Sequence, residues 1–173
     1  NKVAESIYTA RNTITQRMEG PRSSAVVALD LRGMKEGDVA GFSAFNSDAA
    51  VLGVTMKDGV KTLVLTEESV RLHPHNKAVL DVRKLPVAMV PLEKNKIWLR
   101  IDADFRPGLT RDIAYLWYSL DGKKWNRIGN DYKMRFDWQR FFMGTKFAIF
   151  NYATQEAGGY VDVDYFDYKK INN

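Results

Sequence analysis

Hydrophobic and polar residues alternate with a period of two along most of the chain. In Ile97–Phe105 every second residue is apolar, and the residues between are tryptophan, arginine or aspartate. This pattern predicts a β-strand with one buried face. The same pattern predicts strands over Ser24–Leu31, Val39–Asn46, Ala50–Lys57, Lys61–Thr66, Asp112–Leu120, Lys124–Gly129, Gly144–Tyr152 and Gly158–Tyr168.

Turn signals separate these segments at Met34–Asp38, Lys57–Gly59, Pro107–Gly108 and Ser119–Lys123. Asp-Gly between two alternating runs is typical of a β-hairpin. The only helix signal is Asp137–Phe142, which predicts one short turn with Asp137 as N-cap. Short strands with turns about every 8–12 residues predict an all-β fold, a two-sheet antiparallel sandwich or barrel, as a single domain over 1–173.

Composition and charge narrow the function classes. The 26 Lys and Arg exceed the 21 Asp and Glu by a net charge of +5, and the two signs are interspersed. This argues against a nucleic-acid partner, and no apolar run reaches the roughly 20 residues of a membrane span. The absence of cysteine excludes disulfides, thiol nucleophiles and Cys-ligated zinc, and it leaves the cellular compartment open.

Aromatic residues are concentrated in the second half of the chain, since only Tyr8, Phe42 and Phe45 precede residue 97. Aromatic side chains fit a pleated, half-buried surface, so we expect most of the later ones to lie in the core. The alternative is that some of them line a face that binds sugar or a partner.

Few segments carry a recognisable chemical motif. The chain contains no nucleophile elbow, phosphate loop or dinucleotide fingerprint. His73-Pro74-His75 offers two imidazoles without an evident third ligand, which favours a solvated loop over a metal site.

Asp162 and Asp164 are the strongest candidates for chemistry. On a regular strand they project to one face, and Val161, Val163 and Tyr165 project to the other. Two carboxylates on one face could perform acid–base catalysis on a glycosidic bond, bind calcium through oxygen ligands, or serve a structural role.

Several strings, in this order along the chain, resemble one known module. They are Ala10–Arg17 followed by Gly20-Pro21, Met34–Phe42, Tyr118–Gly122 with Trp125, Phe150–Thr154, and Gly158–Phe166. Together they resemble the C-terminal domain of glycoside hydrolase family 43 (GH43) enzymes, which are β-xylosidases and α-arabinofuranosidases.

The resemblance implies a concanavalin A-like, laminin-G-like sandwich (jelly roll) of two antiparallel sheets. In that family the sandwich follows a catalytic five-bladed propeller, which this chain lacks. We therefore expect the chain to be the non-catalytic C-terminal part of a longer hydrolase, trimmed near the domain boundary. Its partners would be the propeller and a plant cell-wall oligosaccharide such as xylan or arabinan, with no nucleic acid and no membrane. A secreted or periplasmic location is favoured over a cytoplasmic one.

The residues expected to contact sugar or the propeller are Trp98, Trp117, Trp138 and Tyr160, with Arg17, Asn151 and Asp162 as hydrogen-bonding groups. In some family members a loop places a phenylalanine against the active site. The corresponding region here, 66–78, contains no aromatic residue, so that role is not transferred. Two alternatives stay open: a free-standing jelly-roll glycosidase that uses Asp162 and Asp164, and a lectin-like module with calcium at the same two carboxylates.

Overall fold

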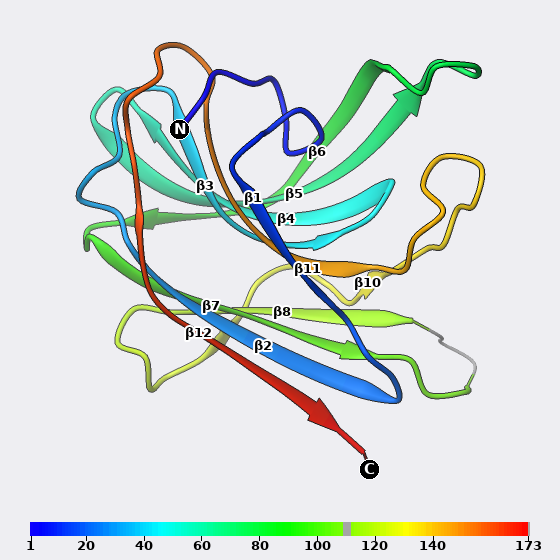
Figure 1. Ribbon diagram of the computed structural model, residues 1–173. Helices are drawn as coiled ribbons and strands as arrows, with labels where there is room; N and C mark the ends of the chain where they lie inside the picture. The colour runs from blue at the N-terminus through cyan, green and yellow to red at the C-terminus, as the bar shows by residue number, and fades with distance from the viewer. Residues whose placement is uncertain (109–111, 173) are drawn as a thin grey trace.

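The computed structural model describes residues 1–108 and 112–172, which form two stacked antiparallel β-sheets (Figure 1). The first sheet has the order β1 (Thr13–Arg17), β11 (Lys146–Ala153), β3 (Asp38–Phe45), β4 (Asp48–Lys57), β5 (Val60–Leu72) and β6 (Val79–Leu92). The second has the order β10 (Tyr132–Lys133), β8 (Ile113–Ser119), β7 (Lys96–Asp104), β2 (Arg22–Asp30) and β12 (Asp162–Ile171), and β9 (Asn126–Arg127) pairs with β8. The all-β sandwich expected from the alternation is confirmed. No helix in the described residues is long and apolar enough to cross a membrane.

The main core lies between the sheets and contains the apolar residues of the predicted alternating strands. Ile97, Leu99 and Ile101 on β7 are fully buried, as expected for the inner face of that strand. On the facing sheet, the rings of Phe42 on β3 and Phe147 on β11 stack with centroids 5.8 Å apart. Complete burial of side chains of this size stabilises the fold by about 1.5–3 kcal/mol each.

Most of the later aromatic residues do not belong to this core. Tyr132 and Phe147 are buried in it, and three partly buried rings pack against it: Phe105, Tyr118 and Tyr168. Phe150 and Tyr152 are buried on the other side of the first sheet, and the tryptophans are half-buried or exposed. The expectation of a core position is therefore wrong for most of them. The reason is that alternation places many of these rings on the outer face of the second sheet, where they pack beside arginines.

A smaller second cluster lies on the outside of the first sheet. The chain from Asn1 to Asn12 crosses this face (Figure 1) and buries Ile7 against Val51 and Phe150. The Tyr8 hydroxyl donates a hydrogen bond to the Ser47 carbonyl at 2.9 Å. The N-terminal segment therefore acts as a cover that keeps this side of the sheet from water.

The longest strand, β6, has no counterpart among the predicted segments. It pairs with β5 along nearly its whole length and carries Pro86 and Pro91. Proline is tolerated on an edge strand because one side of that strand needs no ladder hydrogen bonds. The β5–β6 hairpin projects from the body of the sandwich, alongside the loop that precedes β11 (Figure 1). Its tip is held to that loop by a hydrogen bond from Lys77 Nζ to the Gln139 carbonyl at 3.0 Å.

A β-bulge at Asp164 changes the faces predicted for β12. Beyond it, Phe166 turns inward to Phe42, with ring centroids 6.2 Å apart. Tyr165 pairs with Ala28 on the outer side, so Val163 and Tyr165 do not share a face as regular alternation predicts. One extra residue in the strand is enough to reverse the side-chain pattern.

Candidate functional site

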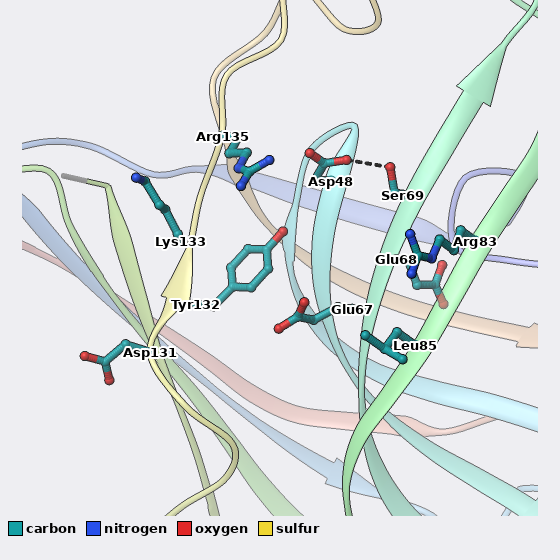
Figure 2. A pocket seen from close by; sticks show the side chains of 10 residues that line it. All are labelled: Asp48, Glu67, Glu68, Ser69, Arg83, Leu85, Asp131, Tyr132, Lys133 and Arg135. Atoms are coloured by element: carbon teal, nitrogen blue, oxygen red, sulfur yellow. Dashed lines mark hydrogen bonds between the residues drawn. The ribbon is translucent and has the colours of Figure 1, made fainter. Parts of the chain in front are cut away.

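The largest cavity described lies at the open end of the sandwich, where β10 stops and the inner face of β4–β6 continues uncovered. It has a volume of about 480 Å³. Figure 2 shows the side chains that line it: Asp48, Glu67, Glu68, Ser69, Arg83, Leu85, Asp131, Tyr132, Lys133 and Arg135. We call this space the concave cavity. The inner face of β4–β6 forms one wall of the cavity, and the segment 131–135 forms the opposite wall.

Asp48 lies at the end of the cavity nearest the loop before β11. Its carboxylate accepts hydrogen bonds from Ser69 Oγ at 2.6 Å and from Arg140 Nη1 at 2.9 Å. Burial by itself would raise the pKa of Asp48, but these two hydrogen bonds and the positive charge of Arg140 hold it below its ordinary value. Asp48 is therefore ionised at neutral pH, and both hydrogen bonds go to its Oδ1 atom.

Tyr132 directs its hydroxyl toward the middle of the cavity (Figure 2). Burial of the ring, with the nearby carboxylates of Asp48 and Glu67, raises the pKa of this hydroxyl. Tyr132 consequently stays protonated over the physiological range and can donate a hydrogen bond to a ligand.

Next to the cavity, residues 136–142 form an exposed segment that we call the aromatic loop. Phe136, Trp138 and Phe142 have 59%, 64% and 85% of their surface exposed. Phe136 and Phe142 meet edge to face, with centroids 6.0 Å apart. Exposed aromatic side chains in such proximity are typical of a surface that binds a partner.

The aromatic loop is nevertheless held in one conformation. Asp137 Oδ1 accepts hydrogen bonds from the backbone N–H groups of Gln139 and Arg140, which confirms the short turn with Asp137 at its start. Arg140 fastens the turn to β4 and β5, and Phe141 packs on Tyr8 with centroids 6.0 Å apart. The loop therefore presents its outer rings from a fixed base.

The residues predicted to bind sugar or the propeller do not form one site. Trp98 and Trp117 share the outer face of the second sheet, where Arg100 stacks on Trp117 at 4.7 Å from the ring centroid. Asn151 and Tyr160 lie beside the N-terminus, because Asn1 bonds to both Asn151 and Gly159. Arg17 ends β1 at the exposed edge of the first sheet, and Trp138 belongs to the aromatic loop. Their roles in binding stay predictions.

Asp162 and Asp164 lie near the start of β12, outside the concave cavity. Asp164 forms an ion pair with Lys96, and Asp162 pairs across the strands with Asp30, which itself binds Arg32. Within the described ranges, no group of three or more His, Asp or Glu side chains is arranged to hold a metal ion. A calcium or catalytic role for the two aspartates stays a prediction without further support.

The segment 66–78, considered as a candidate active-site loop, forms the end of β5 and the tip of the β5–β6 hairpin. The aromatic loop faces this tip and carries three exposed aromatic residues. The sequence signal that could have identified it is the string Phe136-Asp137-Trp138-Gln139-Arg140-Phe141-Phe142, where several aromatics occur in a segment without strand alternation.

Two antiparallel sheets with a partly uncovered concave face define a concanavalin A-like β-sandwich. The sequence model of the β-xylosidase C-terminal concanavalin A-like domain family matches residues 2–169. The chain belongs to this family, which confirms both the resemblance and the fold expected from the sequence.

Individual relatives are GH43 enzymes. A bifunctional GH43-CE protein of Bacteroides eggerthii is 39% identical, with a TM-score of 0.84, and the match covers 99% of this chain and 20% of that one. An engineered GH43 enzyme with endo-xylanase and exo-arabinofuranosidase activity is 32% identical, with a TM-score of 0.84, and 99% and 33% of the two chains are covered. A β-xylosidase of Formosa agariphila is 28% identical over 165 residues, which is 93% of this chain and 24% of that protein. The chain thus spans between a fifth and a third of these relatives, and it is a domain of the accessory type found in GH43 xylosidases and arabinofuranosidases.

Proposed function

We propose that this domain packs against the catalytic domain of a GH43 glycoside hydrolase that acts on xylan or arabinan oligosaccharides, with the aromatic loop at the contact. The observation that carries the proposal is the combination of exposure and rigidity in this loop. Three large rings are exposed, yet Arg140 and Phe141 fix the backbone beneath them. A preorganised surface loses little conformational entropy when it binds.

The size of the aromatic surface suits a contact between domains. Each aromatic side chain can bury about 150–250 Å², so three of them supply several hundred Å² of an interdomain interface of roughly 600–1,500 Å². The long relatives, in which domains of this kind are joined to further GH43 sequence, support a partner within the same chain.

The test uses the GH43 enzyme that contains this domain, in its wild-type form and with Trp138→Ala and Phe142→Ala combined. We expect the double variant to separate one cooperative thermal transition into two and to increase proteolytic cleavage between the domains. Activity toward xylo-oligosaccharides should fall if the contact supports the active site.

Tyr165→Ala is the matched control, because Tyr165 is an exposed aromatic residue on the second sheet, 46% accessible. It should leave the single transition unchanged. A double variant with the melting profile and cleavage pattern of the wild type would refute docking through the aromatic loop.

A further inference from the structure

The concave cavity contains more cationic than anionic groups that are available to a ligand. Arg83, Lys133 and Arg135 reach it from β6 and from the segment 131–135. Within residues 1–108 and 112–172, no ion pair joins any of these three side chains to a carboxylate. Three cationic groups without an ion-pair partner in the described ranges thus border one open cavity, and Arg135 acts on Asp48 through its charge alone.

The carboxylates around the cavity are mostly engaged elsewhere. Asp48 is paired with Arg140 at 2.9 Å, and Asp131 is paired with Arg127 at 2.7 Å. Glu68 borders the cavity through its strand, but it pairs with Ala49, whose side chain belongs to the outer cluster. Glu67 is therefore the one carboxylate of the lining that has neither an arginine partner nor a position on the outer face.

The cavity also has neutral groups that suit a carbohydrate. The Tyr132 hydroxyl remains a donor, Glu67 is an acceptor, and Leu85, 48% exposed, adds an apolar surface for the C–H groups of a sugar ring. The volume of about 480 Å³ lies within the roughly 300–1,000 Å³ typical of small-ligand sites.

We propose that the concave cavity binds an acidic oligosaccharide, in which the carboxylate of a uronic acid unit is bound by Arg135, and Arg83 on the facing wall donates hydrogen bonds to sugar hydroxyls. Guanidinium groups bind carboxylates through paired, charge-assisted hydrogen bonds, which are stronger than neutral ones. Lys133 adds positive charge at the rim, while Glu67 and Tyr132 bond to sugar hydroxyls. The carbohydrate nature of the ligand rests on the proposed function, whereas its negative charge follows from the lining residues.

The outer face of the second sheet is a weaker site for the same ligand. Its arginines, Arg100 and Arg127, both stack on Trp117 and are ion-paired to Asp102 and Asp131. An acidic sugar would have to displace these contacts, whereas Arg83, Lys133 and Arg135 form no ion pair among the described residues that would have to break.

The test is isothermal titration calorimetry on the chain 1–173 with two probes, xylotriose carrying one glucuronic acid branch and unbranched xylotriose. We expect the acidic probe to bind at least about tenfold more tightly. Arg135→Gln should weaken the acidic probe by roughly tenfold and leave the neutral probe unchanged, and Arg135→Lys should retain part of the affinity. Arg83→Gln should weaken both probes alike, because Arg83 bonds to hydroxyls that both probes carry.

Lys57→Gln is the control for loss of one positive charge, because Lys57 is exposed at the far end of β4. Circular dichroism of each variant establishes that it is folded. Equal affinity for both probes, no binding of the acidic probe at millimolar concentration, or unchanged affinity of the acidic probe in Arg135→Gln would overturn the inference. Equally strong displacement by inorganic phosphate would also overturn it, since the site would then select anions rather than acidic sugars. Docking between domains is not involved in this titration, so its outcome is independent of the test of the proposed function.

Discussion

Arg140 Nη1 donates a hydrogen bond to Asp48 Oδ1 over 2.9 Å, and this contact connects the aromatic loop to the concave cavity. The same guanidinium bonds to Ser69 Oγ at 3.0 Å and, through Nε, to Asp137 at 2.7 Å. One side chain therefore orients the base of the loop and neutralises the carboxylate at the end of the cavity. The proposed docking surface and the proposed sugar site share this arginine.

Replacement of Arg140 by methionine should destabilise the fold and release the aromatic loop. The change leaves Asp48 with a partly buried negative charge and removes the contacts to β5. Loss of one partner from a buried pair costs about 3–5 kcal/mol, and the partial exposure of this pair reduces the expected loss to roughly 1–3 kcal/mol. Urea denaturation measures the loss, and limited proteolysis between residues 134 and 145 detects the released loop.

Lys169→Met is the matched control. Lys169 pairs with Asp167 at 3.1 Å, and 70% and 50% of the two side chains are exposed to water. Exposed pairs of this kind contribute little, so no measurable change is expected. Similar losses of unfolding free energy in the two variants would contradict a special stabilising role for Arg140 beneath the aromatic loop.

The buried carboxyl of Glu68 should make stability depend on pH in an unusual direction. Glu68 is 4% exposed, and its Oε2 atom has no hydrogen-bond partner among the described residues. Burial raises the pKa of Glu68 above its ordinary 4.5, although Lys84 opposes the shift. The folded state therefore favours the protonated form. This stabilising contribution is complete below pH 4.5 and is lost as the pH rises through the pKa of the folded state.

The variant Glu68→Gln tests this effect because glutamine cannot ionise. We expect it to match the wild type in thermal stability near pH 4 and to exceed it at pH 7–8. The difference between the two proteins is the relevant quantity, since carboxylates with lowered pKa, such as Asp48, act in the opposite direction in both. Glu93→Gln, at an exposed position between β6 and β7, is the control and should show no such gain in stability over the wild type from pH 4 to pH 8. A constant difference from pH 4 to 8 would contradict the assignment.

The alternation of apolar and polar residues predicted the strands that have one buried face. It failed where prolines or a β-bulge interrupt the strand. β7 follows the expected pattern along its whole length. β6 escaped detection because prolines interrupt it and most of its residues are exposed at the edge of the sheet. In β12 the bulge at Asp164 reversed the faces, and such an irregularity has no period from which it could be predicted.

The concave cavity could not be assembled from the sequence, because its lining comes from distant segments. Asp48, Arg83 and Tyr132 meet only after the β5–β6 hairpin and β10 have been placed. The tryptophans, in contrast, were easy to single out by type, although the structure distributes them over separate surfaces. Residue type alone indicates candidate contacts, and topology decides which of them meet.

The sequence strings 34–42, 150–154 and 158–166, which resemble the GH43 family, lie against one another in the structure and make close contacts. Both the N–H and the hydroxyl of Thr154 donate to the Gly37 carbonyl at 2.8 Å. Asp38 is fully buried and accepts a hydrogen bond from the Lys35 N–H at 2.8 Å. Gly159 lies directly against Asp38, with no room for a larger residue.

Gly159→Ala should consequently be among the most damaging single-methyl changes in the chain. A Cβ at this position would lie 1.7 Å from Asp38 Oδ2, so the buried carboxylate would have to move away from its donors. We expect a loss of roughly 2–4 kcal/mol in the free energy of unfolding. Gly144→Ala is the control, because a Cβ there meets nothing within 4 Å, and it should change stability by less than about 0.5 kcal/mol. Equal stability of the two variants would be incompatible with the packing of Gly159.

Two adjacent phenylalanines in the aromatic loop should separate folding from docking. Phe141 packs on Tyr8 and on Phe45, with ring centroids 6.0 and 6.2 Å apart, whereas Phe142 is 85% exposed. Phe141→Ala should cost the isolated chain roughly 1–3 kcal/mol, less than for a fully buried ring, and loosen the N-terminal segment. Phe142→Ala should leave the stability of the chain unchanged, because its ring is already in water. In the full GH43 enzyme the order should change: Phe142→Ala should weaken the coupling between domains although the domain itself remains as stable as the wild type. If Phe142→Ala destabilised the isolated chain as much as Phe141→Ala, its ring would serve the fold of this domain rather than the surface presented to a partner.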